Sequence, residues 1–138
     1  MNITVSQVQG KVPVTVLSTA GDLDGSNYQD LIAAVRQAYQ TGARHVVVDL
    51  SQTPYMSSAG LIALHSIALL MRGAEPPSPE SGWNAYHAIT RDQTGSESGQ
   101  PHIKLLKLQP KIQRTLEMTG MDTFFQVYSD LAAAVASF

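Results

Sequence analysis

The chain has 138 residues, of which 43% are hydrophobic and 14% are charged. This length suits one domain and excludes tandem domains, because such a chain buries roughly two-thirds of the surface that its unfolded state exposes. The sequence contains no cysteine, which excludes disulfides, thiolate metal sites and a cysteine nucleophile. A formal net charge of −2, without any run of like charges, provides no basic surface for nucleic acid or an anionic membrane.

The N-terminal part of the chain predicts a hairpin followed by a helix. Apolar residues alternate with polar ones over 3–8 and again over 12–16, around a turn candidate at Gly10-Lys11. From Asn27 the apolar spacing becomes helical, and Gly42 ends that pattern as a C-terminal cap would.

The middle of the chain predicts a central strand and a second helix. His45–Leu50 is a β-branched run without polar alternation, which is typical of a strand buried on both faces. An apolar helix follows as far as Met71, and Ser57 or Ser58 is its N-cap. Two apolar stripes on this helix favour packing on the sheet and on the neighbouring helix over an exposed patch. The first stripe is Leu61, Leu64, Ala68 and Met71, and the second is Ile62 and Leu69.

Residues 73–101 show no sustained period and hold four of the seven prolines. We interpret them as a surface insertion within a single domain, 1–138, and expect the insertion to be dispensable for folding. Its aromatic cluster of Trp83, Tyr86 and His87 either folds back onto the domain, which we favour, or is held out for a partner.

The C-terminal part completes an alternation of strands and helices. We expect a strand over 103–108, a helix from Pro110 to Thr119-Gly120, a short strand over 124–127 and a helix over 131–137 capped by Ser129 or Asp130. The order β-β-α-β-α-β-α-β-α predicts an α/β fold, with about four helices on a mixed, mostly parallel sheet of about five strands. We expect one sheet-helix core that buries Val46, Val47, Val48, Leu50, Leu61, Leu105 and Val127.

Enzymatic chemistry has little support in the residues. The four histidines, His45, His65, His87 and His102, lack metal-ligand spacing, and no phosphate-binding glycine loop or Gly-x-Ser-x-Gly elbow occurs. We therefore expect no catalytic residue, no metal and no cofactor. No targeting signal is visible, and the longest apolar stretch, 59–71, is too short to cross a bilayer, so we expect a cytoplasmic protein without a membrane partner.

Three segments resemble the motifs of a known family, and they occur at matching positions along the chain. Residues 47–61 read VVDLSQTPYMSSAGL, Gly21-Asp22-Leu23-Asp24 follows the second predicted strand, and residues 116–125 read LEMTGMDTFF. They resemble the motifs of the STAS domain, the module shared by sulfate transporters and anti-sigma factor antagonists. In that family a strand ends in Asp-Leu-Ser, an Asp-Ser-Ser-Gly-Leu motif opens the next helix, and similar Gly-Glu-Leu-Asp and Leu-Thr-Gly-Leu-Asp motifs occur.

The resemblance covers nearly the whole chain apart from the insertion. It implies a β-α superhelix whose first strand is antiparallel. It also implies an anti-sigma factor antagonist, which captures a partner that is both an anti-sigma factor and a serine kinase, and so releases a sigma factor. A serine phosphatase and a second copy of the chain are further candidate partners.

The resemblance implies a switch at the start of the second helix. The phosphorylated serine of the family motif matches Ser58, with Ser57 as the alternative acceptor, and a phosphate there would oppose binding through its charge and its hydration. Where the family has Asp and a second Ser, this chain has Ser57 and Ala59. The alternative interpretation is that both serines only cap the helix and pack.

The candidate partner-binding residues implied by the resemblance are Asp24, Ser57, Ser58, Ala59, Gly60 and Leu61. Asp24 either orients the acceptor loop through hydrogen bonds to backbone N–H groups or serves as a helix N-cap. A second hypothesis for function is a STAS module that is never phosphorylated and serves as a structural or ligand-sensing subunit of a larger signalling or transport assembly.

Overall fold

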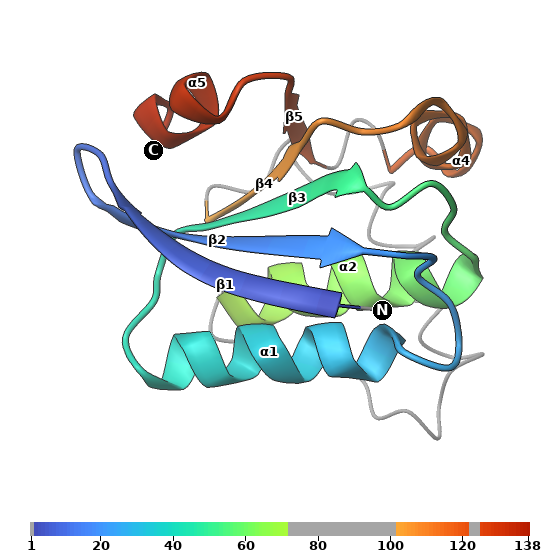
Figure 1. Ribbon diagram of the computed structural model, residues 1–138, viewed down its shortest axis with the longest axis horizontal. Coiled ribbons are helices and arrows are strands. Elements are labelled where there is room, and N and C mark those ends of the chain that lie inside the picture. The colour runs from blue at the N-terminus through green and yellow to red at the C-terminus, as the bar shows by residue number, and fades with distance from the viewer. Residues whose placement is uncertain (1, 72–101, 122–124) are drawn as a thin grey trace.

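The computed structural model describes residues 2–71, 102–121 and 125–138, and its elements follow in the predicted order (Figure 1). They are β1 (Asn2–Gln9), β2 (Pro13–Ala20), α1 (Tyr28–Gln40), β3 (Val46–Gln52), α2 (Ser58–Met71), β4 (Ile103–Leu106), α4 (Pro110–Thr119), β5 (Gln126–Tyr128) and α5 (Leu131–Ala136). The predicted insertion, 73–101, and Phe124 lie outside the described residues.

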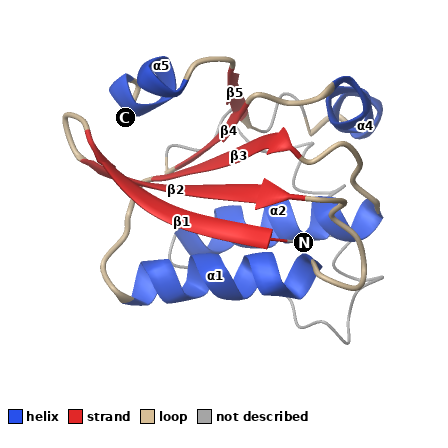
Figure 2. Ribbon diagram, in the orientation of Figure 1, coloured by secondary structure: helices blue, strands red, loops and turns tan. Residues whose placement is uncertain are grey.

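The five strands form one sheet in the order β1-β2-β3-β4-β5 (Figure 2). β1 pairs antiparallel with β2, and β2 to β5 pair in parallel. The two arrangements follow from the connections, because a tight turn permits only an antiparallel pair and parallel neighbours need a long crossover. The predicted mixed, mostly parallel sheet with an antiparallel first strand is confirmed.

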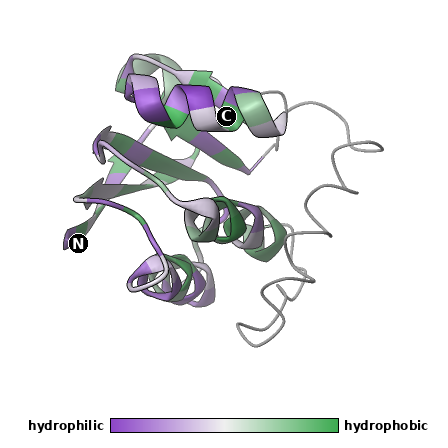
Figure 3. Ribbon diagram, turned by 90° about the vertical axis from the view of Figure 1, so that its right-hand side faces the viewer, coloured by the Kyte–Doolittle hydropathy of each residue, from purple (hydrophilic) through white to green (hydrophobic). Residues whose placement is uncertain are grey.

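The sheet separates two hydrophobic clusters. Val48 and Leu105 pack with α1 and α2 on one face, whereas Val47 and Leu106 pack with α5 on the other. Figure 3 shows α1 and α2 on one side of the sheet and the C-terminal end on the opposite side. The prediction that β3 is buried on both faces is confirmed, but the prediction of one core is wrong, because alternate β3 side chains point to opposite faces.

Two details of the C-terminal part correct the sequence-based expectations. Val127 is 37% exposed and not part of a core, because β5 is a three-residue edge strand. β4 ends at Leu106 and not at Leu108, because Lys107 adopts a left-handed conformation with φ 55°. Two predicted helix caps are confirmed. Gly120 ends α4 in a left-handed conformation with φ 77°. Asp130 begins α5, and its carboxylate accepts a hydrogen bond from Ala133 N.

α2 is buried along most of its length, and it packs against α1 and the sheet. All four residues of its first stripe are buried, and Ile62 is half-buried against the same cluster. Of the second stripe, Ile62 therefore packs on this core, and Leu69 is half-buried.

A cluster of two histidines and a lysine lies where β3 and β4 begin. The rings of His45 and His102 are 5.7 Å apart, and Phe138 lies 5.1 Å from His45. Lys104 is buried, donates to Gln126, and has its Nζ 4.9 Å from the Phe138 ring. Within the described ranges, Nδ1 of each histidine is buried without a hydrogen-bond partner. Desolvation, reinforced by the positive charges of His102 and Lys104, lowers the pKa of His45.

The cluster predicts loss of stability in mild acid. The folded state lowers the pKa of His45 below its ordinary value of about 6.5, so over that range the unfolded chain takes up a proton at His45 more readily than the folded chain does. The free energy of unfolding should therefore fall as pH drops below that value and level off below the lowered pKa of the folded state. Urea melts between about pH 8 and about pH 5 measure this, and the uncharged variant His45→Gln should lose less stability over that range. If the free energy of unfolding changed equally with pH in the parent and in His45→Gln, a lowered pKa of His45 would be contradicted.

Because both faces of the sheet are buried, we predict that Val47→Asp unfolds the domain. Val47 is fully buried between the sheet and α5, so an aspartate there would be an unpaired buried charge that costs several kcal/mol, on the order of the whole stability. Val127→Asp is the matched control, because Val127 is on the same sheet and exposed. Circular dichroism melts compare the two, and a Val47→Asp protein that melts like the parent would refute this packing.

Candidate functional site

The loops that follow β2 and β3 are bound together by main-chain hydrogen bonds. Leu23 carries two of them: its N–H donates to Tyr55 O at 3.0 Å, and its carbonyl accepts from Ser57 N at 2.9 Å. A short parallel bridge between Leu23 and Met56 accompanies them. Behind this bridge, Gly21 N donates to Gln52 O at 3.0 Å. The site therefore lies at the carboxyl ends of parallel strands, where open α/β sheets commonly place their binding sites.

Polar side chains, buried for the two threonines and half-buried for Gln109, fix the base of the same loops. The hydroxyls of Thr19 and Thr53 are 2.5 Å apart, and Thr53 also donates to Thr19 O at 3.2 Å. Gln109, just before α4, donates from its amide to Ser51 O at 2.8 Å. Sequence reasoning missed these residues, because a threonine before a proline and a glutamine in a loop carry no local sign of burial.

Ser57 is the N-cap of α2. Its hydroxyl accepts from Ala59 N at 3.2 Å and its carbonyl accepts from Gly60 N at 2.9 Å, so two N–H groups of the first turn are satisfied. Ser58 is the first helical residue and its side chain is exposed, whereas Ser57 is half-buried. Of the two serines offered as N-cap by the sequence, the structure places Ser57 in that position.

Gly60 allows α2 to approach the bridge closely. It is buried, and a Cβ added there would lie 2.6 Å from Met56 Sδ and 3.2 Å from Leu23 Cδ2. Leu61 beside it is also buried in the core. Of the six candidate partner-binding residues, Gly60 and Leu61 therefore shape the site from beneath, and Ser58 lies at its surface.

Asp24 lies next to the bridge. Its carboxylate accepts from Ser26 Oγ at 2.6 Å and from Ser26 N at 2.9 Å, and these bonds hold the pKa of Asp24 below its ordinary value. Its carbonyl accepts from Tyr28 N at 2.9 Å at the start of α1. The side chain thus bonds within its own loop, and contact with the Ser57 loop runs through the main chain of Leu23.

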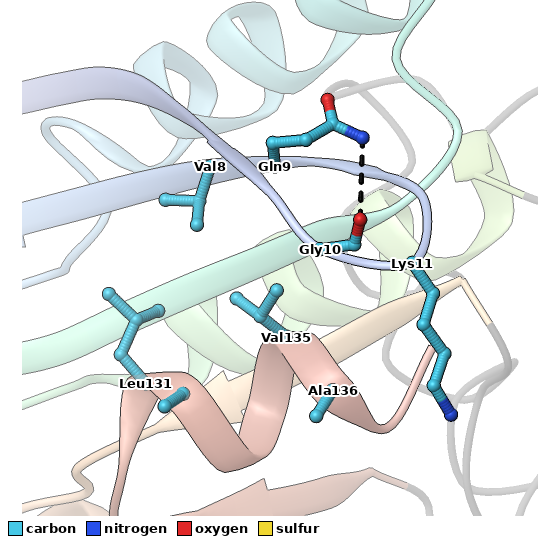
Figure 4. A pocket seen from close by; sticks show the side chains of 8 residues that line it. Val8, Gln9, Gly10, Lys11, Leu131, Val135 and Ala136 are labelled. Carbon is cyan, nitrogen blue, oxygen red and sulfur yellow. Dashed lines mark hydrogen bonds between the residues drawn. The ribbon is translucent and has the colours of Figure 1, made fainter.

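A second concave feature lies at the other end of β2. A pocket of about 380 Å³ separates the β1–β2 turn from α5 (Figure 4). Val8, Leu131 and Val135 line it with apolar side chains, and a Cβ on Gly10 would lie 2.5 Å from Val135 Cγ1. The pocket therefore lies beside the point where the hairpin turn meets α5, and none of the residues that line it belongs to the Ser57–Ser58 loop.

The described part of the chain contains no cluster of three or more acidic, histidine or cysteine residues that could hold a metal. Among the same residues, no helix combines the length and the apolar character needed to cross a membrane.

Comparisons with known proteins agree on one family. The family model described as MlaB, STAS domain matches residues 6–75, about half of the chain. BtrV of Bordetella bronchiseptica, assigned as an anti-sigma factor antagonist, is 24% identical over 138 residues, which is 100% of this chain and 95% of BtrV.

Two solved structures share the fold. An anti-sigma factor antagonist from Thermotoga maritima superimposes with a TM-score of 0.65 at 16% identity, over 96% of this chain and 90% of that one. The phosphorylated form of Bacillus SpoIIAA does so with a TM-score of 0.52 at 14% identity, over 96% of each chain.

The fold and the family match together define the class: the chain belongs to the STAS domain family. Within that family, the relatives that it resembles are described as anti-sigma factor antagonists. The resemblance found in the sequence motifs is confirmed.

The close approach at Gly60 predicts that Gly60→Ala destabilises the domain. The new methyl group would displace the Met56 side chain, and overpacking of this kind costs about 1–3 kcal/mol. Gly25→Ala is the matched control, because a Cβ there has no heavy atom within 4 Å. Urea unfolding of both variants measures the difference, and equal midpoints would show that α2 does not depend on this contact.

Proposed function

We propose that this protein is an anti-sigma factor antagonist that is switched by phosphorylation of Ser58. In its unphosphorylated form it captures a partner that is both an anti-sigma factor and a serine kinase, and a sigma factor is released. The observation that carries the proposal is the exposure of Ser58 at the start of a helix whose entry is fixed by Leu23.

Ser58 suits the acceptor role better than Ser57. The Ser57 hydroxyl is occupied as a cap, and its backbone N–H is bonded to Leu23 O, so a kinase would have to break the helix start to reach it. The Ser58 side chain leaves the first turn toward solvent, where it can enter a kinase site without local unfolding.

A phosphate at Ser58 would be tolerated by the fold and opposed by an interface. It adds about −1.5 to −2 charges at neutral pH. The first turn of α2 has no acidic residue, and the partial positive charge of a helix N-terminus stabilises an anion by about 0.3–1 kcal/mol. In a closed interface the same charge would lose its water, which makes phosphorylation an off-switch for binding. The phosphorylated form of SpoIIAA, which shares this fold, supports the proposal.

The two departures from the family motif are compatible with the switch. Serine and aspartate are both good N-caps, so Ser57 keeps the cap while removing one negative charge next to the acceptor. Ala59 replaces a hydroxyl at a half-buried position. We therefore infer that the change at Ser57 alters kinase recognition and leaves the helix start intact.

The proposed activity is regulated binding in the cytoplasm, without catalysis by this chain. A serine phosphatase would restore the binding form. A second candidate function, a STAS subunit that is never phosphorylated within a larger signalling or transport assembly, is favoured by one observation: Ser57 stands where the family carries aspartate.

The switch predicts that two substitutions at Ser58 differ in their effect on partner binding. Ser58→Ala should retain binding to an anti-sigma kinase, whereas Ser58→Asp should weaken it by about tenfold or more, or about 1.4 kcal/mol. Calorimetric titration with the kinase measures both affinities, and melting curves confirm that both variants fold. Ser58→Asn is the matched control, because asparagine has nearly the size and shape of aspartate without its charge, and it should bind like the parent. Wild-type affinity for Ser58→Asp would refute the switch.

A further inference from the structure

β1 is an edge strand with an open outer side. Within the described part of the chain, β2 is the one strand that pairs with it. All eight residues of β1 pair with β2 in an unbroken register from Asn2↔Ala20 to Gln9↔Pro13, so no bulge interrupts the strand. Its outward N–H and C=O groups therefore form a regular ladder that can accept another strand. Figure 1 shows β1 at the rim of the sheet.

Natural sheets protect such edges, and β1 carries none of the usual devices. Charged side chains, prolines, bulges and very short strands all discourage pairing at an edge. β1 reads NITVSQVQ, with no charge and no proline, and it is eight residues long. The opposite edge of the sheet, β5, has only three residues. Among the residues that the structure describes, the long unpaired edge of the sheet is therefore β1.

Val5 gives the edge an apolar centre. It is 51% exposed, in the middle of β1. It pairs with Leu17, which is fully buried toward α1 and α2, so the Val5 side chain lies on the same face of the sheet at its outer rim. A strand added beside β1 would cover it.

We propose that β1 pairs antiparallel with β1 of a second copy, with Val5 on the two-fold axis, so that two sheets become one. A second copy fits because an antiparallel edge is complementary to itself. This register places Val5 opposite Val5, Thr4 opposite Ser6 and Ile3 opposite Gln7, so no like charges meet and two exposed valines are buried together. One strand pair of this length gives a small interface, so we expect a weak, reversible dimer.

The dimer leaves both Ser58 sites open. β1 begins beside the end of β2, which leads into the Leu23 loop. Because the two-fold axis reverses the strand direction, the two Ser58 sites would lie at opposite ends of the joined sheet. The dimer would thus be bivalent toward its partner, and its formation is independent of whether Ser58 is phosphorylated.

Cysteine cross-linking tests the register, since the chain has no cysteine of its own. Residues opposite one another in antiparallel strands have Cβ atoms about 4.5–5.5 Å apart, so Val5→Cys should form a disulfide-linked dimer when oxidised with diamide. Gln9→Cys is the matched control, because this register separates the two copies of residue 9 by about 26 Å. We expect Val5→Cys to cross-link at least tenfold faster.

Sedimentation equilibrium tests the association without cross-linking. Val5→Lys, which sets two charges face to face, should raise the dimer dissociation constant at least tenfold, whereas the β-branched, uncharged Val5→Thr should change it by less than threefold. Melting curves confirm that both variants fold, since Val5 is exposed. A parent protein that stays monomeric up to about 1 mM, or equal cross-linking at the two cysteine positions, would overturn the proposal.

Discussion

The main-chain bridge from Leu23 to the loop between β3 and α2 determines the form of the site. It holds Ser57 by its N–H, which places the Ser57 hydroxyl over the first turn of α2 as a cap. It also brings the side chains of Leu23 and Met56 so close to α2 that any residue larger than glycine at position 60 would have to displace them. These bonds are between backbone atoms, so they constrain the loop whatever side chains it carries. The exposed position of Ser58 follows from them.

The burial of α2 explains how a small modification could act as a switch. Because almost all of the helix is buried against α1 and the sheet, a charge at its first residue cannot move the helix without loss of the core. The effect of a phosphate would therefore stay at the surface, where it acts on the partner through charge and hydration. A rigid element with one exposed, chemically modifiable residue is well suited to reversible control of binding.

Much of this fold could be predicted from local patterns. The alternation in β1 and β2, the Pro110 start of α4 and the cap at Asp130 are local signals, and each is confirmed. The packing of α5 over the Val47 face of the sheet and the exposure of Val127 on the short edge strand β5 depend on how elements distant in the chain meet, which local patterns do not encode. For the same reason the sequence motifs indicated Ser57 and Ser58 but not the Leu23 bonds that position them.

Phosphate mapping tests whether the helix start anchored by Leu23 exposes Ser58 to a kinase and keeps Ser57 out of reach. The protein is incubated with an anti-sigma kinase and ATP, and mass spectrometry locates the phosphate in the parent, Ser58→Ala and Ser57→Ala chains. We expect phosphate on Ser58 of the parent and of Ser57→Ala, and none at this helix start in Ser58→Ala. Phosphate on Ser57, or a kinase that binds the parent tightly and leaves Ser58 unmodified, would contradict this expectation.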